Sequence, residues 1–370
     1  MRNPFFCGAA ALPFLLCGIQ AAAQDDTEII DPSTEEAAPI VVNYVPLHPA
    51  AGMMNEHMHD GGELMLGLRY SRSSHRGANQ TGTSDISDAD IHAAGYGVRA
   101  SRMEMDMVML DIMYAPNDRL TFMVMPHWMR HEMTMVGIDP MNTGMDMDGM
   151  DMGHAHSGLP FGQTMTHSTQ GFSDTLISGS LRLARSSSFN AHATFGVWLP
   201  TGKVGRTNAD GTFVHYGMQS GSGTWDIEPS VTISGAKGAF GWGAQGSYRW
   251  RTEERNASGF AFGDKAMLTA WGSYLVSSMA SVTTRLSWEH EGQILGHYNA
   301  AHKHASPSDR QANYGGDKVL AGLGLNLALP FRGPKPPQLG FEASVPLYQN
   351  LNGIQLPEDW RLSLSISKTF

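Results

Sequence analysis

Cysteine is almost missing from this 370-residue chain: only Cys7 and Cys17 occur, both near its beginning. Charge is also scarce, because Asp, Glu, Lys and Arg make up 16% of residues, against about a quarter in soluble domains. Beyond residue 24 no apolar run approaches the ~20 residues that a membrane-spanning helix needs. The chain has a net charge of −10, whereas nucleic-acid-binding proteins present a basic surface. These absences exclude a helical membrane protein and argue against a nucleic-acid partner.

The first 23 residues are predicted to be a signal peptide. Arg2 supplies a positive charge, residues 4–19 form an apolar core, and residues 21–23 (AAA) fit a cleavage site. A lipoprotein anchored through Cys17 is the alternative, but the bulky Leu16 before it fits that reading poorly. Removal of the signal takes both cysteines, so the exported chain has no disulfide, thiolate metal site or cysteine nucleophile.

Residues 24–62 are predicted to be an acidic, proline-bearing periplasmic tail that ends in a cluster of Met and His. After residue 62 the sequence pattern changes to an alternation of apolar and polar residues, which continues to residue 370. Twelve candidate strands follow from it, near 63–71, 103–115, 119–131, 173–184, 190–199, 224–234, 239–250, 265–276, 281–290, 318–329, 338–347 and 360–370.

The connections between these strands alternate between long and short. Those at 72–102, 132–172, 200–223, 251–264, 291–317 and 348–359 are long, and the others are short. A soluble β-sandwich has no reason to sort its loops in this way, whereas outer-membrane barrels combine short periplasmic turns with long extracellular loops. We therefore predict an all-β fold: a transmembrane antiparallel up-and-down β-barrel of about 12 strands over 63–370. Its place is the outer membrane of a Gram-negative bacterium, in contact with outer-membrane lipid.

The last strand supports this prediction. Trp360, Leu362, Leu364, Ile366 and Phe370 share one face. An amphipathic strand that ends in Phe resembles the signal read by the bacterial barrel-assembly machinery, which we therefore expect as a partner. The alternative is an ordinary edge strand of a secreted β-protein.

Several stretches resemble a family of outer-membrane transporter barrels associated with the meta-pathway of phenol degradation. They are GFSDTLISGSLRL (171–183), FGVWLPTGK (195–203), MQSGSGTWDIEPSVT (218–232) and YGGDKVLAGLGLNL (314–327). HMHDGGELMLGLRY (57–70) and MVMLDIMYAPNDRLTFMVMPHW (107–128) look like a Met-rich subgroup of it. The resemblance covers roughly 57–370. The resemblance implies a β-barrel fold and an association with the breakdown of aromatic compounds, and it does not identify the solute that the barrel transports.

Methionine is concentrated in one part of the chain: sixteen of its 24 methionines fall within residues 103–165. Those of the second strand share one face, and the third strand is predicted to turn Met123, Met125, His127, Met129 and His131 toward the lumen. Thioether sulfur is soft and favours Cu(I) over Zn²⁺ or Ca²⁺. The alternatives are that Met merely fills an irregular lumen, or that a register shift turns it to lipid.

Two further clusters carry the same donor atoms. The loop 132–172 contains MDMDGMDMGHAH, with the candidate metal ligands Met145, Met147, Met150, Met152, His154 and His156. The segment before the first strand contributes Met53, Met54, His57, Met58 and His59. Thioethers suit Cu(I), and imidazole also accepts Cu(II). The alternatives are a low-complexity loop and an unstructured pre-barrel segment.

Three functions remain open at this point. The first is an outer-membrane channel or transporter that binds or passes copper ions, with no required cofactor. The second is a conduit for small hydrophobic or aromatic compounds, which implies an apolar lumen with a lateral opening. The third is a surface metal-binding or structural barrel that transports nothing. We expect no enzyme, since no H-E-x-x-H or G-x-S-x-G motif occurs.

Overall fold

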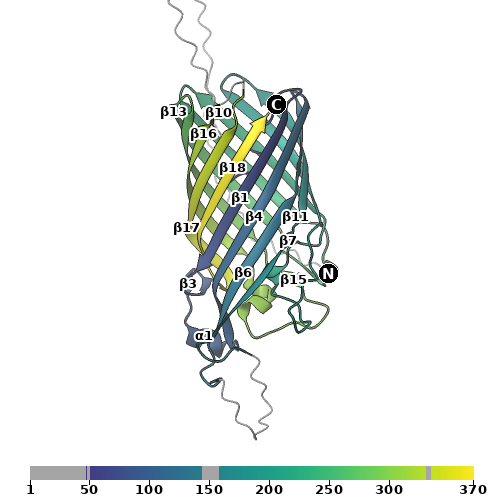
Figure 1. Ribbon diagram of the computed structural model, residues 1–370, viewed down its shortest axis with the longest axis vertical. Helices are drawn as coiled ribbons and strands as arrows, with labels where there is room; N and C mark the ends of the chain where they lie inside the picture. Colours follow the sequence, from purple (N-terminus) through teal and green to yellow (C-terminus); the bar gives the residue numbers. More distant parts are fainter. Residues whose placement is uncertain (1–46, 48–50, 144–157, 331–334) are drawn as a thin grey trace, which may run out of the picture. The chain divides into compact units, whose positions relative to one another are not determined.

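Twelve wall strands close into an antiparallel barrel in the computed structural model of the chain, which describes residues 47, 51–143, 158–330 and 335–370 (Figure 1). Each wall strand pairs with its neighbours in sequence, and the ring closes because β1 pairs with both β18 and β4. Closure pairs the wall strands on both sides, as a bilayer requires of β-structure, except that β7 (Thr164–Phe172), on the side of the long loops, pairs with β6 (His127–Gly137) only.

The wall strands agree with all twelve segments expected from the alternation. They are β1 (Leu64–Arg76), β4 (Val98–Asn117), β5 (Leu120–Met125) with β6 (His127–Gly137), β7 (Thr164–Phe172) with β8 (Thr175–Arg185), β9 (Phe189–Leu199), β10 (Asp226–Lys237), β11 (Phe240–Arg251), β13 (Lys265–Ser277), β14 (Ala280–Glu291), β16 (Gly316–Ala328), β17 (Gln338–Gln355) and β18 (Glu358–Thr369).

Two wall strands are interrupted at the same height. Pro126 separates β5 from β6, and Ser173 and Asp174 separate β7 from β8. Proline has no N–H to donate to a neighbouring strand, so a break in the ladder is expected there. On either side of the break β5 pairs with β8 and β6 pairs with β7.

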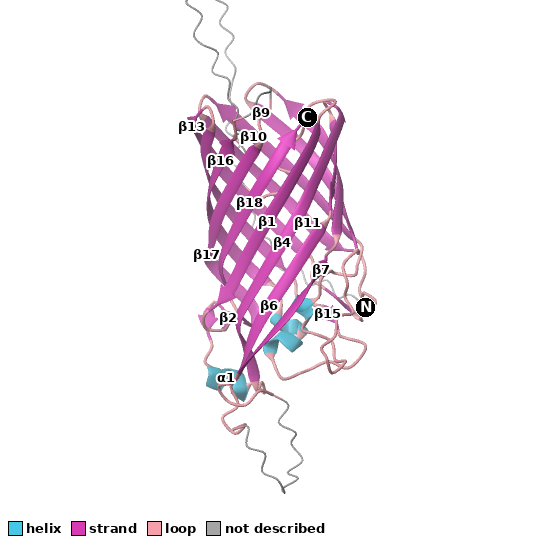
Figure 2. Ribbon diagram, viewed as in Figure 1, coloured by secondary structure: helices cyan, strands magenta, loops and turns pink. Residues whose placement is uncertain are grey.

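The short elements all lie in the long loops, at the end opposite the C-terminus (Figure 2). They are β2 (Gln80–Gly82), β3 (Ser84–Asp85), α1 (Asp88–Ala93), η1 (Tyr216–Met218), β12 (Phe260–Ala261), β15 (Leu295–Gly296), η2 (Pro307–Asp309) and η3 (Gln311–Asn313). No helix among the described residues is long and apolar enough to cross a membrane.

Two expected loops are shorter than the sequence suggested. The connection expected at 348–359 was wrong: β17 runs to Gln355 and β18 starts at Glu358, because the far half of β17 pairs with β16 and with β2. The ends of the expected loop 132–172 are also strand, since Glu132–Gly137 and Thr164–Phe172 pair with each other. In both cases pairing between distant segments extended the strands into residues with turn or polar character.

The barrel exterior carries an apolar band that is bounded by aromatic residues at both ends. Along β1, Leu64, Leu66 and Leu68 are exposed and Met65 is buried. Toward the short turns the exposed aromatics are Tyr114, Phe122, Phe240, Trp242, Tyr274 and Phe370, and toward the long loops they are Phe172, Trp225, Tyr248, Trp250 and Tyr348. Two such girdles flanking an apolar band are the pattern of a transmembrane barrel.

Candidate functional site

The segment that precedes β1 lies inside the barrel. We call residues 51–60 the plug. Side chains of strands far along the sequence hold the plug and Leu47 before it: Ser273 of β13 donates to the carbonyl of Leu47 at 2.8 Å, and Gln245 of β11 donates to the carbonyl of Met54 at 3.1 Å. Met53 is 2% exposed. The plug therefore occupies part of the lumen.

Arg69 of β1 ties the plug to the wall. Its Nε donates to Asp111 of β4 at 2.5 Å, and its Nη2 lies 3.5 Å from the carboxylate of Glu56 in the plug. Its Nη1 donates to the carbonyl of Met53. A buried guanidinium needs several acceptors, and here both the wall and the plug provide them.

Asn55 is the second anchor. Its backbone has a φ of 55°, a conformation that Asn tolerates better than most residues. Its carbonyl accepts from His192 at 2.9 Å and from Gln245 at 3.2 Å, and its side chain accepts from Ser178 at 3.1 Å. Three wall strands thus hold one turn of the plug.

The other end of the plug is held near the short turns. The backbone N–H of His59 donates to Thr121 at 3.2 Å, and its carbonyl accepts from Arg182 at 3.2 Å. Asp60 forms a 2.6 Å ion pair with Arg185. These contacts lead the chain out of the lumen and into β1.

One wall of the lumen is built from methionine and histidine. The register of β4 and β6 places four pairs side by side: Met103 with Met133, Met105 with His131, Met107 with Met129, and Met109 with His127. We call these the Met/His rungs. All eight side chains line one cavity. The prediction that this face points to the lumen is confirmed, while Phe122 and Val124 face outward, 51% and 40% exposed.

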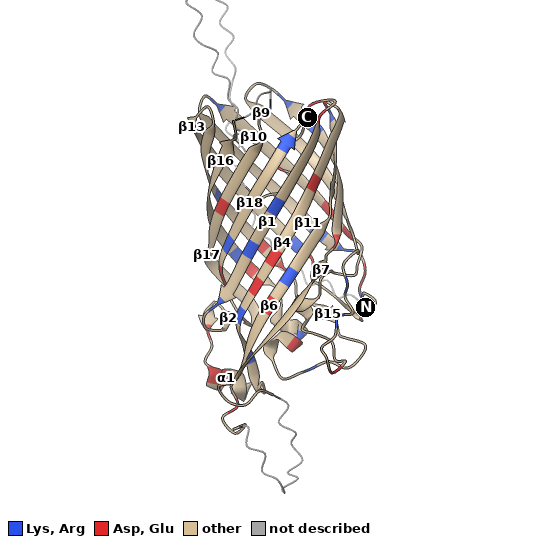
Figure 3. Ribbon diagram, in the orientation of Figure 1, with Lys and Arg blue, Asp and Glu red and all other residues tan. Residues whose placement is uncertain are grey.

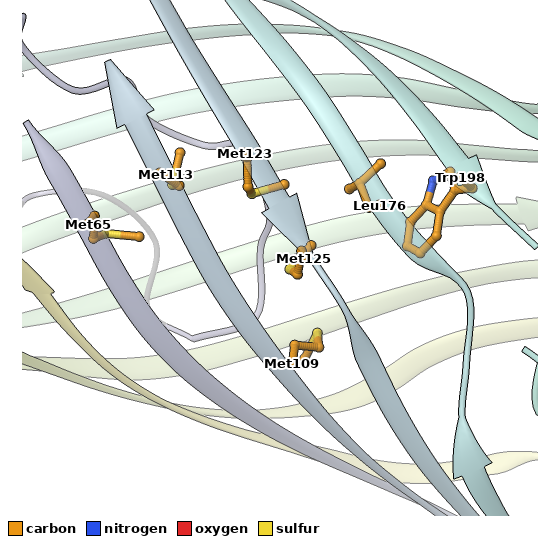
Figure 4. Close-up of a cluster of buried hydrophobic side chains, with 7 residues drawn as sticks. All are labelled: Met65, Met109, Met113, Met123, Met125, Leu176 and Trp198. Carbon is orange, nitrogen blue, oxygen red and sulfur yellow. The ribbon is translucent and has the colours of Figure 1, made fainter. Parts of the chain in front are cut away.

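Closer to the short turns the same wall packs into a buried apolar cluster. Met65, Met109, Met113, Met123 and Met125 gather from β1, β4 and β5, and Leu176 and Trp198 complete the cluster (Figure 4). Met54 of the plug packs against it. At this level methionine fills the space between wall and plug, as its flexibility allows.

A second part of the lumen wall, on β10, β11, β14 and β18, is charged. The charged residues on the strands gather across the middle of the barrel and toward the long loops (Figure 3). Inside the lumen Arg249 pairs with Glu228 at 2.9 Å, and Arg251 pairs with Asp226. Arg361 lies 2.9 Å from both Glu289 and Glu358. On this side of the lumen these charged residues are paired with one another.

Trp198 joins the two walls, and sequence reasoning missed it. Its ring stacks on His127 with centroids 5.2 Å apart, and the Arg249 guanidinium lies 3.6 Å above it. Its Nε1 donates to Glu228 at 2.8 Å. The alternation of side chains along β9 could have indicated its place, because Trp198 lies on the same face as the polar residues His192 and Thr194 and so faces the lumen.

The long loops pack over the end of the lumen. Tyr216 and Tyr298 stack with centroids 4.3 Å apart, and Phe213 stacks on the other face of Tyr298, also at 4.3 Å. Phe260 and Ile294 complete this buried cluster. Burial raises the pKa of Tyr298 above its ordinary value, so the hydroxyl stays protonated and accepts a 2.9 Å hydrogen bond from Gln219.

The plug divides the remaining space. A cavity of about 930 Å³ opens toward the short turns and is lined by Glu56, His57, Met58, His59 and Asp60 of the plug. A second cavity, of about 610 Å³, is lined by Ala51–Met54, the Met/His rungs, Trp198 and Phe262. We call them the vestibule and the upper cavity.

The predicted metal ligands divide into three groups. Met53, Met54, His57, Met58 and His59 lie in the plug, and Met123, Met125, His127, Met129 and His131 lie on the wall facing it. Met145, Met147, Met150, Met152, His154 and His156 lie outside the described residues. Among the residues that the structure describes, no group of three or more His, Asp or Glu is arranged to hold a metal ion.

Comparison with known proteins identifies the fold and no closer relation. No protein-family profile and no curated sequence matches the chain. A solved structure, the COG4313 outer membrane channel from Pseudomonas putida F1, superposes with a TM-score of 0.55 at 15% identity over 85% of this chain and 98% of that one. The chain is an outer-membrane β-barrel. The NanC porin is less similar, with a TM-score of 0.40 at 7% identity over 82% and 98% of the two chains.

A third structure, the CymD monoaromatic hydrocarbon channel, has a TM-score of 0.37 at 8% identity over 84% of this chain and 88% of that one. Similarity at this level carries no information on solute. The resemblance to phenol-pathway barrels and their Met-rich subgroup therefore stays a prediction.

Proposed function

We propose that this barrel is an outer-membrane channel for small apolar molecules of about the size of one aromatic ring. The observation that carries the proposal is the upper cavity. Its volume of about 610 Å³ is in the range of sites that enclose small ligands. A solved structure similar in fold to this chain is described as an outer membrane channel.

The chemistry of the upper cavity favours an apolar solute with one polar group. Thioethers are polarizable and contact aromatic rings favourably, and the Met/His rungs line one side. Trp198 and Phe262 add aromatic surface. The charged side is already paired within the wall, so a fully charged solute would have to compete with Glu228 and Glu289 for their arginines.

Flux through asymmetric vesicles with a lipopolysaccharide outer leaflet tests this proposal. A monocyclic aromatic alcohol is compared with a monosaccharide of similar mass, and we expect the aromatic compound to cross faster. Changing Met105, Met107 and Met129 together to Gln should slow it at least tenfold, since Gln has a similar length but is polar. Changing the same three to Leu should preserve it. Equal flux of both solutes would contradict the proposal.

A second candidate function is capture or passage of Cu(I), and the Met/His rungs favour it. Cross-strand partners have Cβ atoms about 5 Å apart, so flexible side chains of adjacent rungs can converge on one ion. Met107, Met129 and His131 together offer two thioethers and an imidazole, donors that suit Cu(I).

The same Leu variant separates the two candidates. Met→Leu keeps size and apolarity but removes sulfur, so it should leave aromatic flux intact and abolish Cu(I) binding in a competition titration. The loop methionines are tested in parallel by changing Met145, Met147, Met150 and Met152 to Leu. Unchanged Cu(I) affinity in both variants would remove the soft-metal function.

A further inference from the structure

Two histidines of the plug face each other in the vestibule. The Nε2 atoms of His57 and His59 are 3.2 Å apart. Residues two apart in an extended segment project to the same side, and residues 56–59 belong to no helix or turn. Both side chains line the vestibule, where His57 is 24% exposed and His59 is 7% exposed.

The opposite nitrogen of each ring faces a carboxylate. Nδ1 of His57 lies 3.1 Å from Glu56, and Nδ1 of His59 lies 3.1 Å from Glu63. Carboxylates accept hydrogen bonds, so each Nδ1 must carry the hydrogen. A neutral imidazole has only one N–H, so the Nε2 atoms, 3.2 Å apart, are the nitrogens of the two rings that can bind a metal ion.

We propose that His57 and His59 form a two-imidazole site for a divalent transition-metal ion of the Cu²⁺ class, completed by water from the vestibule. Two nitrogens ~2.0 Å from one ion are about 2.8 Å apart as neighbours in a square-planar site and about 3.3 Å apart in a tetrahedral one, and the observed separation of 3.2 Å lies between these limits. Carboxylates that orient the outer nitrogens are the usual surroundings of metal-binding histidines.

The neighbouring cations do not oppose such a site. Arg182 and Arg185 are paired with Asp60, and Lys335 is paired with Glu63. Arg69 is shared by Asp111 and Glu56. Each of these four positive groups therefore lies beside a carboxylate, and Asp60 serves both Arg182 and Arg185.

This site goes beyond the proposed solute channel and differs from the Cu(I) candidate in its ligands. Imidazole suits Cu²⁺, Ni²⁺ and Zn²⁺, and Cu²⁺ binds such ligands most tightly. Both ligands belong to the plug, and Glu63 belongs to the segment that enters β1. A bound ion would stiffen the plug where it leaves the lumen.

In the experiment, the full chain is folded in detergent and titrated with CuCl₂. Electron paramagnetic resonance measures the bound Cu²⁺, and electron spin echo modulation counts the imidazoles that coordinate it. His154 and His156 are changed to Gln in every protein, so that they do not contribute. The double variant His57→Gln with His59→Gln should lose one bound Cu²⁺ ion per chain, the ion whose spectrum shows two coordinated imidazoles. The matched control is His302→Gln with His304→Gln, a second pair two residues apart whose ring centroids are 4.3 Å apart.

A third variant tests the role of the carboxylate. Glu63→Gln should weaken Cu²⁺ binding by roughly tenfold to a hundredfold and keep the two-imidazole spectrum. Heat modifiability on gels checks that each barrel is folded. The proposal is overturned if the His57/His59 variant keeps the same two-imidazole Cu²⁺, or if the parent protein shows none, in which case a shared proton joins the rings. Aromatic flux is measured separately, so the site and the channel can fail independently.

Discussion

Arg285 and Glu342 illustrate how single residues stabilise the lumen. The Nε of Arg285 donates to both carboxylate oxygens of Glu342, at 3.0 and 3.1 Å. Their side chains are 4% and 2% exposed. Gly52 of the plug lies directly over the pair, where a Cβ would fall 2.1 Å from Glu342. The wall pair and the plug therefore depend on each other's shape.

Arg285→Met should destabilise the barrel, because it leaves Glu342 as a buried charge without its partner. The expected loss of unfolding free energy is about 3–5 kcal/mol, measured by urea unfolding in lipid vesicles. The double variant Arg285→Met with Glu342→Leu should recover most of it. Lys303→Met is the control, since its pair with Asp210 is exposed and its loss should change little. Equal effects in both single variants would contradict this assignment.

Gly52→Leu should displace the plug while the barrel remains folded. No side chain fits between Gly52 and the Arg285–Glu342 pair without moving one of them. We expect higher single-channel conductance in planar bilayers and unchanged heat modifiability. Gly205→Leu is the matched control, because nothing lies within 4 Å of a Cβ at that position. If conductance rises equally in both variants, steric displacement of the plug is not the cause.

Among the elements, the loop between β9 and β10 is held by one side chain at the strand break. Asp174 accepts from the backbone of Gly202 at 3.0 Å and from both the backbone and the hydroxyl of Ser222 at 2.7 Å. Its own carbonyl lies 2.7 Å from His127 Nδ1. The break between β7 and β8 thus gives Asp174 the position from which it orders the loop.

Asp174→Ala should free this loop without unfolding the wall. Hydrogen bonds to a charged group contribute about 1.5–3 kcal/mol each, so losing even one favours local opening by roughly tenfold. Trypsin cleavage after Lys203 or Arg206, followed by mass spectrometry, should accelerate at least that much. Asp210→Ala is the control in the same loop, because its bonds remain within its own turn and to Lys303. Similar cleavage of both variants would count against the anchoring role.

Elements were predictable from sequence where periodicity determines them. The side-chain alternation placed all wall strands and the lumenal face of Met123–His131, because one face contacts lipid and the other does not. It failed at β17, where Asn352, Gly353 and Pro357 suggest a loop. Pairing with Gln80–Gly82 extends the strand there, and such pairing between distant segments leaves no local pattern.

For the molecule as a whole, the plug is the main feature that sequence reasoning did not find. Its residues lack periodicity and follow an acidic, proline-bearing stretch, which is typical of a disordered tail. They are held through backbone carbonyls that accept from Arg69, Gln245 and His192. Such bonds do not depend on the plug's own side chains, so its sequence carries little trace of them.

Deleting residues 47–58 should open the barrel without preventing its closure, since every wall pairing lies outside that range. We expect conductance to rise severalfold and urea stability to fall, because Arg69 and Gln245 lose acceptors. Deleting residues 24–35 is the length-matched control. If the variant without residues 47–58 keeps the conductance of the wild type, the long loops alone determine the width of the pore.

The length of sequence between the plug and its anchors sets the order in which the protein can assemble. Leu47 and Ser273 are 226 positions apart, and Asn55 and Gln245 are 190 apart. Contacts between such distant positions form slowly, because a long chain must be closed before they contribute. The plug is synthesised before the wall strands but is therefore among the last segments to form its native contacts. A newly closed barrel passes through a stage in which its lumen is still unobstructed, and anything that occupies the lumen during that stage competes with the protein's own amino terminus.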